Sequence, residues 1–354
     1  MRSVDSSATV VTLSGPSDLV GVLPALIGFR PSESLVVLCM HGSRLRTGLA
    51  MRFDLPPEER RGAVVAEAVR CAVGEGADAV LVVCYTDGAD TQQELPQTTL
   101  VQAVVEAALV QGVGVVDALL VRGKAWFSYT CEAECCPRSG TPLPDPGEGA
   151  AGRFAAEAAL HGRVIRASRA ELEASVRGPV AVREIAVRQV FDRAAATLAA
   201  EWEHHGPGAA HAQTVSLVEA AVARRGGGGR VVTDDQAARI VTGLDDRWAR
   251  DDVATLPVED QAAFLDVLVE LARRTPDGRS AAICTVVAWV AYQHGNGALA
   301  NVALDRALRD DPAYVMARVL LEAMGARVHP SRMRSMARDV QRRVRAERPM
   351  ARWA

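Results

Sequence analysis

The stretch LVVLCM at residues 35–40 decides how the first part of the chain folds. A continuous apolar run of this length is typical of a strand that is buried on both faces. Two further strands are expected at 79–84 and 115–121, and the segments between the three runs carry apolar residues at helical spacing. Strands that alternate with helices predict an α/β domain with a mostly parallel sheet.

Two hairpin strands extend this predicted sheet. Residues 45–55 alternate apolar and polar side chains, which predicts an antiparallel partner for the first strand. A second return strand is expected at 125–130. A short helix is expected before the first strand, because Ser17 suits a helix start and Gly28 suits a helix end.

The second part of the sequence is helical. Half of the 16 residues at 137–152 are proline or glycine, so neither a helix nor a central strand continues through them. We therefore divide the chain into an α/β domain at 1–136, a Pro/Gly-rich linker at 137–152, an all-α domain at 153–330 and a basic C-terminal helix at 331–354. Helices are expected at 153–160, 169–176, 182–205, 213–225, 234–244 and 257–273.

Two local patterns refine the helical part. Thr233 and Gln236 have the spacing of a capping box at a helix start. Small and apolar residues at 285–325 follow the rhythm of one tetratricopeptide-like helical hairpin, which predicts that two helices pack closely there. The residues that carry the rhythm are Ala288, Ala291, Gly295, Ala300, Leu304, Ala307 and Pro312.

Composition narrows the class of protein. The 354 residues are 49% hydrophobic and carry a net charge of −3, which excludes a chain disordered throughout and fits two folded domains. No apolar run is long enough to span a membrane, and the first residues lack the layout of a secretory signal. We therefore expect a cytoplasmic protein whose seven cysteines are reduced.

The sequence contains no familiar catalytic motif. Phosphate-binding loops, paired C-x-x-C, H-E-x-x-H and G-x-S-x-G are all missing, so whether the protein is an enzyme stays open. Lys124 is the only lysine beside 39 arginines, a bias that we attribute to a GC-rich genome.

Two motifs and the helical hairpin carry a family resemblance. The first motif is GFRPSESLVV at residues 28–37, and the second is C-x3-C-C-P at residues 131–137. Together with the hairpin that ends at Asp311-Pro312, they resemble an uncharacterised actinobacterial family, a catalogued domain of unknown function, over about residues 14–325. The resemblance implies no activity, substrate or catalytic residue.

Three cysteines form the most distinctive chemical feature. Cys131, Cys135 and Cys136 fall within six residues. Three thiolates with one further ligand, such as His161, would hold zinc, although C-x3-C-C is not a common zinc spacing. The same residues would also suit a redox pair, or they are inert thiols packed over the sheet. We expect no cofactor, with zinc as the alternative.

Two further groups of polar residues are candidates for a site in the α/β domain. Arg30, Ser32, Glu33 and Ser34 lie in the loop before the first strand and are candidate ligand-binding residues. In open α/β sheets, ligands bind beyond the carboxyl ends of the strands. That rule selects four candidate catalytic residues: His41, Tyr85, Asp87 and Arg122. Both groups have a plain structural alternative, as loop-fixing or ordinary strand-end residues.

The C-terminal residues are strongly basic and amphipathic. Residues 331–354 include Arg338, Arg342 and Arg345, which are candidate contacts for nucleic acid or another anion. Met333 and Met336 begin an apolar stripe, which also fits a packed terminal helix with a solvated arginine face.

These observations favour one function over two alternatives. We expect a non-catalytic protein that binds a protein partner through its helical domain, or a small ligand. The first alternative is an enzyme, such as a hydrolase, with its site at the strand ends. The second is association with nucleic acid through the basic tail.

Overall fold

The structure is a computed structural model, which describes residues 12–90, 94–131, 133–160, 164–228 and 232–347, the side chains of Leu160 and 340–347 excepted. It divides into two compact units, one up to Arg169 and one from Ala170. The first is an α/β unit and the second is all-α, as the sequence predicts. The described helices include none with the length and apolar character needed to cross a membrane.

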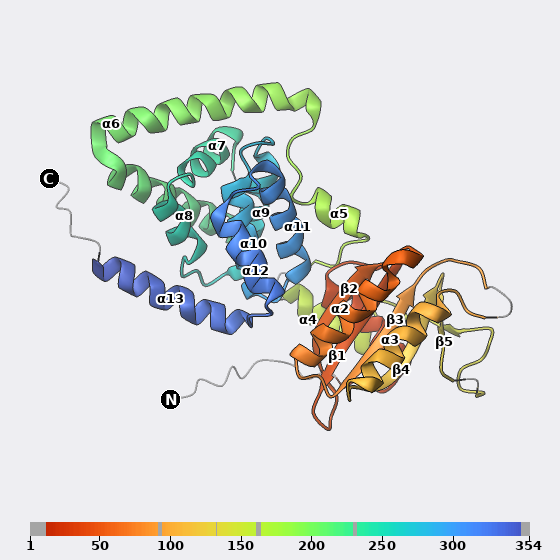
Figure 1. Ribbon diagram of the computed structural model, residues 1–354. Coiled ribbons are helices and arrows are strands. Elements are labelled where there is room, and N and C mark those ends of the chain that lie inside the picture. Colours follow the sequence, from red (N-terminus) through yellow and green to blue (C-terminus); the bar gives the residue numbers. More distant parts are fainter. Residues whose placement is uncertain (1–11, 91–93, 132, 161–163, 229–231, 348–354) are drawn as a thin grey trace. The chain divides into compact units, whose positions relative to one another are not determined.

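The α/β unit contains a six-stranded sheet with helices on its faces (Figure 1). The strand order is β2-β1-β3-β4-β5-β6. Its elements in chain order are α1 (Pro16–Ile27), β1 (Ser34–His41), β2 (Arg46–Asp54), a 3-10 turn (Glu58–Arg60), α2 (Arg61–Gly74), β3 (Ala79–Tyr85), α3 (Thr98–Val110), β4 (Gly114–Arg122), β5 (Ala125–Ser128), β6 (Thr141–Pro142) and α4 (Gly149–Leu160).

The sheet is mixed, where the sequence predicts a mostly parallel one. Among the described strands only β3 and β4 pair in parallel, and β1 runs antiparallel to both of its neighbours. Helix α2 connects β2 to β3, which run in the same direction, but β1 lies between them. The alternation of strands and helices correctly indicates the two crossover connections. It does not indicate that β1 lies between β2 and β3, the two strands that the first crossover connects.

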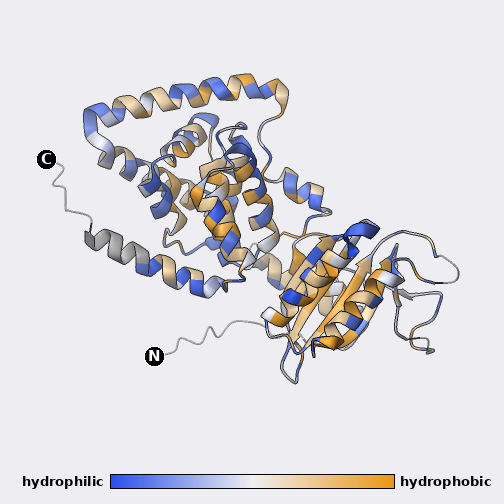
Figure 2. Cartoon of the chain, in the orientation of Figure 1, coloured by the Kyte–Doolittle hydropathy of each residue, from blue (hydrophilic) through white to orange (hydrophobic). Residues whose placement is uncertain are grey.

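Both faces of the sheet are covered. Val37, Val82 and Leu120 point to the face where α2 and α3 pack. Val36 and Val83 on the opposite face are also fully buried. Apolar residues dominate the central strands in Figure 2, as expected for β1 and β3, which are buried along almost their whole length.

Helix α4 belongs to the α/β unit. It packs against α1, so the unit continues to Arg169, beyond the Pro/Gly-rich segment at 137–152 that the sequence favours as the boundary. The backbone explains this continuation, because Phe29 forms a β-bridge with Arg166. The segment from 129 to 148 therefore returns the chain to the same unit.

The all-α unit contains a bent helix and a compact helical core. Helix α6 changes direction at Gly206, whose φ of 77° lies in the left-handed region, and Pro207 follows (Figure 1). The break separates the two helices expected at 182–205 and 213–225. The elements are α5 (Arg169–Ala174), α6 (Ala181–Gly226), α7 (Asp234–Gly243), α8 (Arg247–Ala254), α9 (Gln261–Arg274), α10 (Ala281–Gln293), α11 (Gly297–Asp310), α12 (Val315–Gly325) and α13 (Pro330–Glu347).

Local predictions in this unit are confirmed. The Thr233 hydroxyl accepts from the Gln236 N–H at 3.2 Å and the Gln236 side chain accepts from the Thr233 N–H at 3.0 Å, which completes the capping box. Helices α10 and α11 form the tetratricopeptide-like hairpin, with Gly295 at φ 72° in the turn between them.

A buried arginine ties the helical core together. The Arg306 guanidinium, 4% exposed, donates to the carbonyl oxygens of Ala272 and Thr275, both at 2.7 Å, and to that of Val176. Three backbone acceptors at helix and loop ends are thereby satisfied by one side chain.

Candidate functional site

The antiparallel direction of β1 brings the loop before it to the ends of β3 and β4. Ser34 lies opposite Tyr85 in the register. The Glu33 carboxylate accepts from the Thr86 hydroxyl at 2.9 and 3.0 Å and from the Asp87 N–H at 3.2 Å. Two predicted groups of residues, the loop and the strand ends, therefore meet at one edge of the sheet.

The strand-end residues are engaged with one another. The Asp87 carboxylate accepts from the Gly123 N–H at 3.1 Å. The Arg122 guanidinium forms an ion pair with Asp90 at 2.5 Å and lies over the Phe127 ring at 4.8 Å. The sequence does not single out Thr86, whose contact with Glu33 depends on the direction of β1. It does not single out Asp90 either, which reaches Arg122 at the end of the neighbouring parallel strand β4.

The loop residues mainly hold the loop in shape. The buried Ser34 hydroxyl donates to the Ser32 carbonyl at 2.5 Å and accepts from Arg52 Nε at 2.8 Å. The Arg30 N–H donates to the Arg166 carbonyl at 3.0 Å, while the Arg30 residue is exposed. Glu33 adopts a φ of 40°, a strained value for a residue with a side chain.

The four candidate catalytic residues do not converge. His41 ends β1 at the edge opposite Ser34, seven residues away and so roughly 23 Å along the strand at about 3.3 Å per residue. The Tyr85 hydroxyl is buried and has no hydrogen-bond partner in the described structure. Burial also raises the pKa of Tyr85. Of the four, Tyr85, Asp87 and Arg122 lie at the same end of the sheet as Glu33, but the Tyr85 hydroxyl is buried there.

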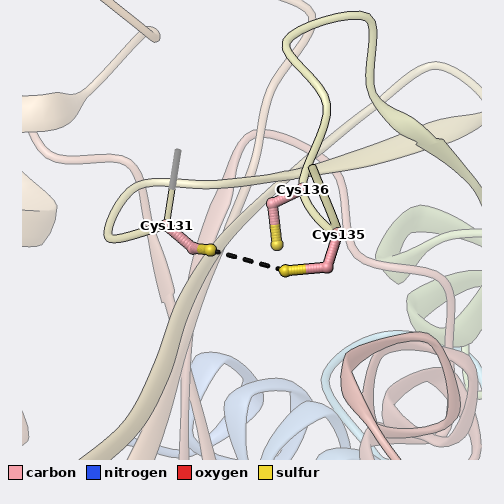
Figure 3. A group of neighbouring side chains, drawn as sticks. All are labelled: Cys131, Cys135 and Cys136. Atoms are coloured by element: carbon pink, nitrogen blue, oxygen red, sulfur yellow. Dashed lines mark hydrogen bonds between the residues drawn. The ribbon is translucent and has the colours of Figure 1, made fainter. Parts of the chain in front are cut away.

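The three cysteines of the cluster do converge (Figure 3). The sulfurs of Cys131 and Cys135 lie 3.7 Å apart, and all three sulfurs lie within 4.8 Å of one another. The pKa of Cys131 is lowered, first by the Ala133 N–H and then by the neighbouring thiols. The pKa of Cys136 is raised to about 12, mainly by burial. None of the seven cysteines, all of them described, forms a disulfide, and His161 lies outside the described residues.

The basic tail is helical as α13 up to Glu347. Met333 is buried while Met336 is 55% exposed, and α13 packs against α10. Arg338 is exposed. The side chains of Arg342 and Arg345 lie outside the part that the structure describes.

A cavity in the all-α unit was not expected from the sequence. It has a volume of about 270 Å³ and is lined by both segments of the bent helix α6 and by residues around the end of α7. Leu198 and three alanines supply much of its apolar wall. The lining residues are Ala195, Leu198, Ala199, Trp202, Ala210, His211, Thr214, Thr242, Gly243, Asp245 and Asp246. We call this the α6 cavity.

One side of the α6 cavity is acidic. His211 Nε2 lies 2.9 Å from the Asp252 carboxylate, and its Nδ1 lies 3.5 Å from that of Asp246. Burial raises the pKa of Asp245, and Arg279 opposes this shift. The lining residues include two carboxylates and one imidazole but no arginine. The nearby Arg239 guanidinium donates to the Thr214 hydroxyl at 3.4 Å but is itself paired with Glu201 at 2.5 Å. The two lining carboxylates therefore favour a positive charge in the cavity.

One buried polar atom at the α6 cavity lacks a partner. Thr242 is 7% exposed, and its hydroxyl makes no hydrogen bond within the described residues. The Thr214 hydroxyl, which also lines the cavity, donates to the Ala210 carbonyl at 2.9 Å. A buried hydroxyl without a partner is unfavourable, so a bound molecule with a polar group would relieve this cost. The sequence marks the bend at Gly206 but not the residues that the bend brings together.

Comparison with known proteins identifies one family. The model of the family described as "Domain of unknown function (DUF4192)" matches residues 16–331. No curated protein and no solved structure matches the chain.

Proposed function

Because the chain belongs to the DUF4192 family, whose function is unknown, we propose its function from the structure: a non-catalytic protein that binds a small ligand in the α6 cavity. The carrying observation is the cavity itself, an apolar pocket with a few polar groups on one side, which is the usual character of a ligand site.

The ligand class follows from the lining. The carboxylates of Asp245 and Asp246 favour an ammonium group, and the apolar wall favours a hydrocarbon body. Trp202, 44% exposed, adds an aromatic face that attracts cations. We therefore propose a small organic ammonium ion with an apolar body, for which the Thr242 hydroxyl would be a hydrogen-bond acceptor.

The arrangement at the strand ends favours binding over catalysis. Glu33, Asp87 and Arg122 are each engaged by a neighbouring side chain or backbone group, and His41 is at the other edge. A general base needs to reach a substrate proton, directly or through one water. An imidazole roughly 23 Å away along a strand cannot reach a substrate bound at this edge.

A protein partner and a cytoplasmic location remain part of the proposal. Val315 and Val319, one helical turn apart on α12, are exposed and would suit contact with a partner. A reducing cytoplasm would keep the closely spaced thiols of the cysteine cluster reduced. Binding of nucleic acid by the exposed Arg338 and its neighbours is the weaker alternative.

The proposal is tested by calorimetric titration with matched probes. We expect 2-phenylethylammonium and related alkyl and aryl ammonium ions to bind more tightly than their neutral alcohol analogues. Asp245→Asn should reduce the affinity ratio between the ammonium ions and the alcohols about tenfold, which is the loss expected for one charged hydrogen bond of roughly 1.4 kcal/mol. Glu219→Gln, an exposed change on α6 away from the cavity, is the control. Equal binding of cations and neutral analogues would contradict the proposal.

A further inference from the structure

We propose that Cys131, Cys135 and Cys136 together bind one zinc ion, with a fourth coordination position left for a ligand from outside the group. This site is separate from the α6 cavity, and it lies in the other unit of the chain. Its basis is the distance between the sulfurs, the way the loop is anchored and the chemistry of the donors.

The distances match those of a zinc–thiolate centre. Tetrahedral zinc with bonds of about 2.3 Å to sulfur holds two ligand sulfurs about 3.8 Å apart. The sulfurs of Cys131 and Cys135 are 3.7 Å apart, and the third sulfur is within 4.8 Å of both. The three side chains point toward one another across the loop (Figure 3). Only small side-chain movements separate this arrangement from a coordinated one.

Hydrogen bonds hold the loop on both sides of the cluster. The Ser128 hydroxyl accepts from the N–H groups of Thr130, at 3.2 Å, and Cys131, at 3.0 Å, and itself donates to Asp117 at 3.3 Å. The Cys136 N–H donates to the Ala133 carbonyl at 2.9 Å. The backbone therefore places the three thiols together without the help of a metal.

The close approach of Gly140 to the Phe127 ring fixes the path of the chain after the cysteine cluster. Gly140 has a φ of +83°, and a Cβ at this position would lie 2.7 Å from the Phe127 ring. The tight turn leads directly into β6, whose Thr141 pairs with Trp126 of β5. A metal bound to the cluster would cross-link this loop between β5 and β6, where secondary structure contributes little.

The donor set selects the metal. Three thiolates are soft ligands, which favour zinc over magnesium or calcium. No fourth Cys, His, Asp or Glu of the described chain belongs to the group. Cys135 is exposed, so water or an external ligand has access to the fourth position.

The test uses the full chain, reduced and handled without oxygen. Titration with zinc against a chromophoric chelator should give one ion per chain. Cys131→Ser and Cys136→Ser should each weaken binding at least about tenfold. Cys71→Ser is the matched control, because Cys71 is a half-buried thiol on α2 outside the cluster, and it should bind as the unaltered chain does.

Two measurements on the unaltered chain keep the test independent of any folding defect in the variants. Zinc-edge X-ray absorption should count three sulfur donors and one lighter donor. Trypsin should cut after the exposed Arg138 more slowly with zinc than without it.

Three results would overturn the proposal. They are the absence of sulfur from the zinc shell, equal binding by Cys131→Ser and Cys71→Ser, and a disulfide between Cys131 and Cys135 in the chain purified without reductant and without oxygen. The last result would identify a redox pair.

Discussion

Two threonines on the wall of the α6 cavity offer a matched pair of substitutions. Thr242 and Thr214 are both buried in helices and both line the cavity. The Thr214 hydroxyl donates to the Ala210 carbonyl, whereas that of Thr242 is buried without a partner in the described structure. Replacing each with valine keeps the branched shape and exchanges the hydroxyl for a methyl group, so the two variants should shift stability in opposite directions.

The size of each change in the free energy of unfolding follows from the hydrogen bonds that each hydroxyl makes. Thr214→Val loses the bond to the Ala210 carbonyl and the long one that Arg239 donates at 3.4 Å, and it should lower the free energy of unfolding by about 1 kcal/mol or more. Thr242→Val removes a desolvated hydroxyl, whose burial costs about 1–3 kcal/mol, and should raise the free energy of unfolding by about 1 kcal/mol. Helix propensities of threonine and valine are similar, so the backbone contributes little to the difference.

Urea unfolding of the ligand-free chain measures this contrast. The midpoints of the two variants should lie on opposite sides of that of the unaltered protein, with unchanged slopes. With saturating ligand, the urea midpoint of Thr242→Val should fall below that of the unaltered protein, because this variant lacks a polar contact that the bound ammonium ion would use. If Thr242→Val destabilises the free protein as much as Thr214→Val does, the Thr242 hydroxyl has a hydrogen-bond partner in the ligand-free chain and is not available for a ligand.

Three other substitutions test the structure around the sites. Arg306→Met should lower the free energy of unfolding by about 3–5 kcal/mol, because three buried carbonyls lose their donor, and calorimetric melting should detect it. Gly140→Ala should cost about 1–3 kcal/mol through its positive φ and the contact with Phe127; an unchanged melting temperature would contradict this. The raised pKa of Asp245 means that its folded form binds a proton more tightly, so stability falls as pH rises from the ordinary carboxyl pKa, about 3.9, through the raised value. The free energy of unfolding of Asp245→Asn should therefore rise relative to that of the unaltered chain as the pH increases through that window. An Asp245→Asn variant that is less stable than the unaltered chain at neutral pH would contradict a raised pKa for Asp245.

Local patterns predicted most of the elements. The apolar runs indicated the main strands, and the Thr233–Gln236 spacing indicated a helix start that the hydrogen bonds confirm. The meeting of Cys131, Cys135 and Cys136 was also predictable, because residues so close in sequence share one loop. In each case the pattern lies within a few residues.

Features that depend on distant residues were not predictable. A strand buried on both faces, such as β1, gives no sign of its direction, so His41 was placed at the wrong edge relative to Tyr85. The α6 cavity depends on Trp202 and Asp245 meeting across more than 40 positions of the chain. The bend at Gly206 makes that meeting feasible, but no spacing rule connects the two.

An organic ammonium ion bound in the α6 cavity would lie beside Trp202, so the indole N–H signal of this residue reports binding at the site. In a nitrogen-labelled sample, titration with 2-phenylethylammonium should shift this signal saturably, and 2-phenylethanol should shift it far less. Trp202→Phe assigns the signal, and Trp289, which does not line the cavity, is the internal control. An unmoved Trp202 signal would show that no ammonium ion binds in the α6 cavity, and an equal response to the neutral alcohol would show that the cavity does not select positive charge.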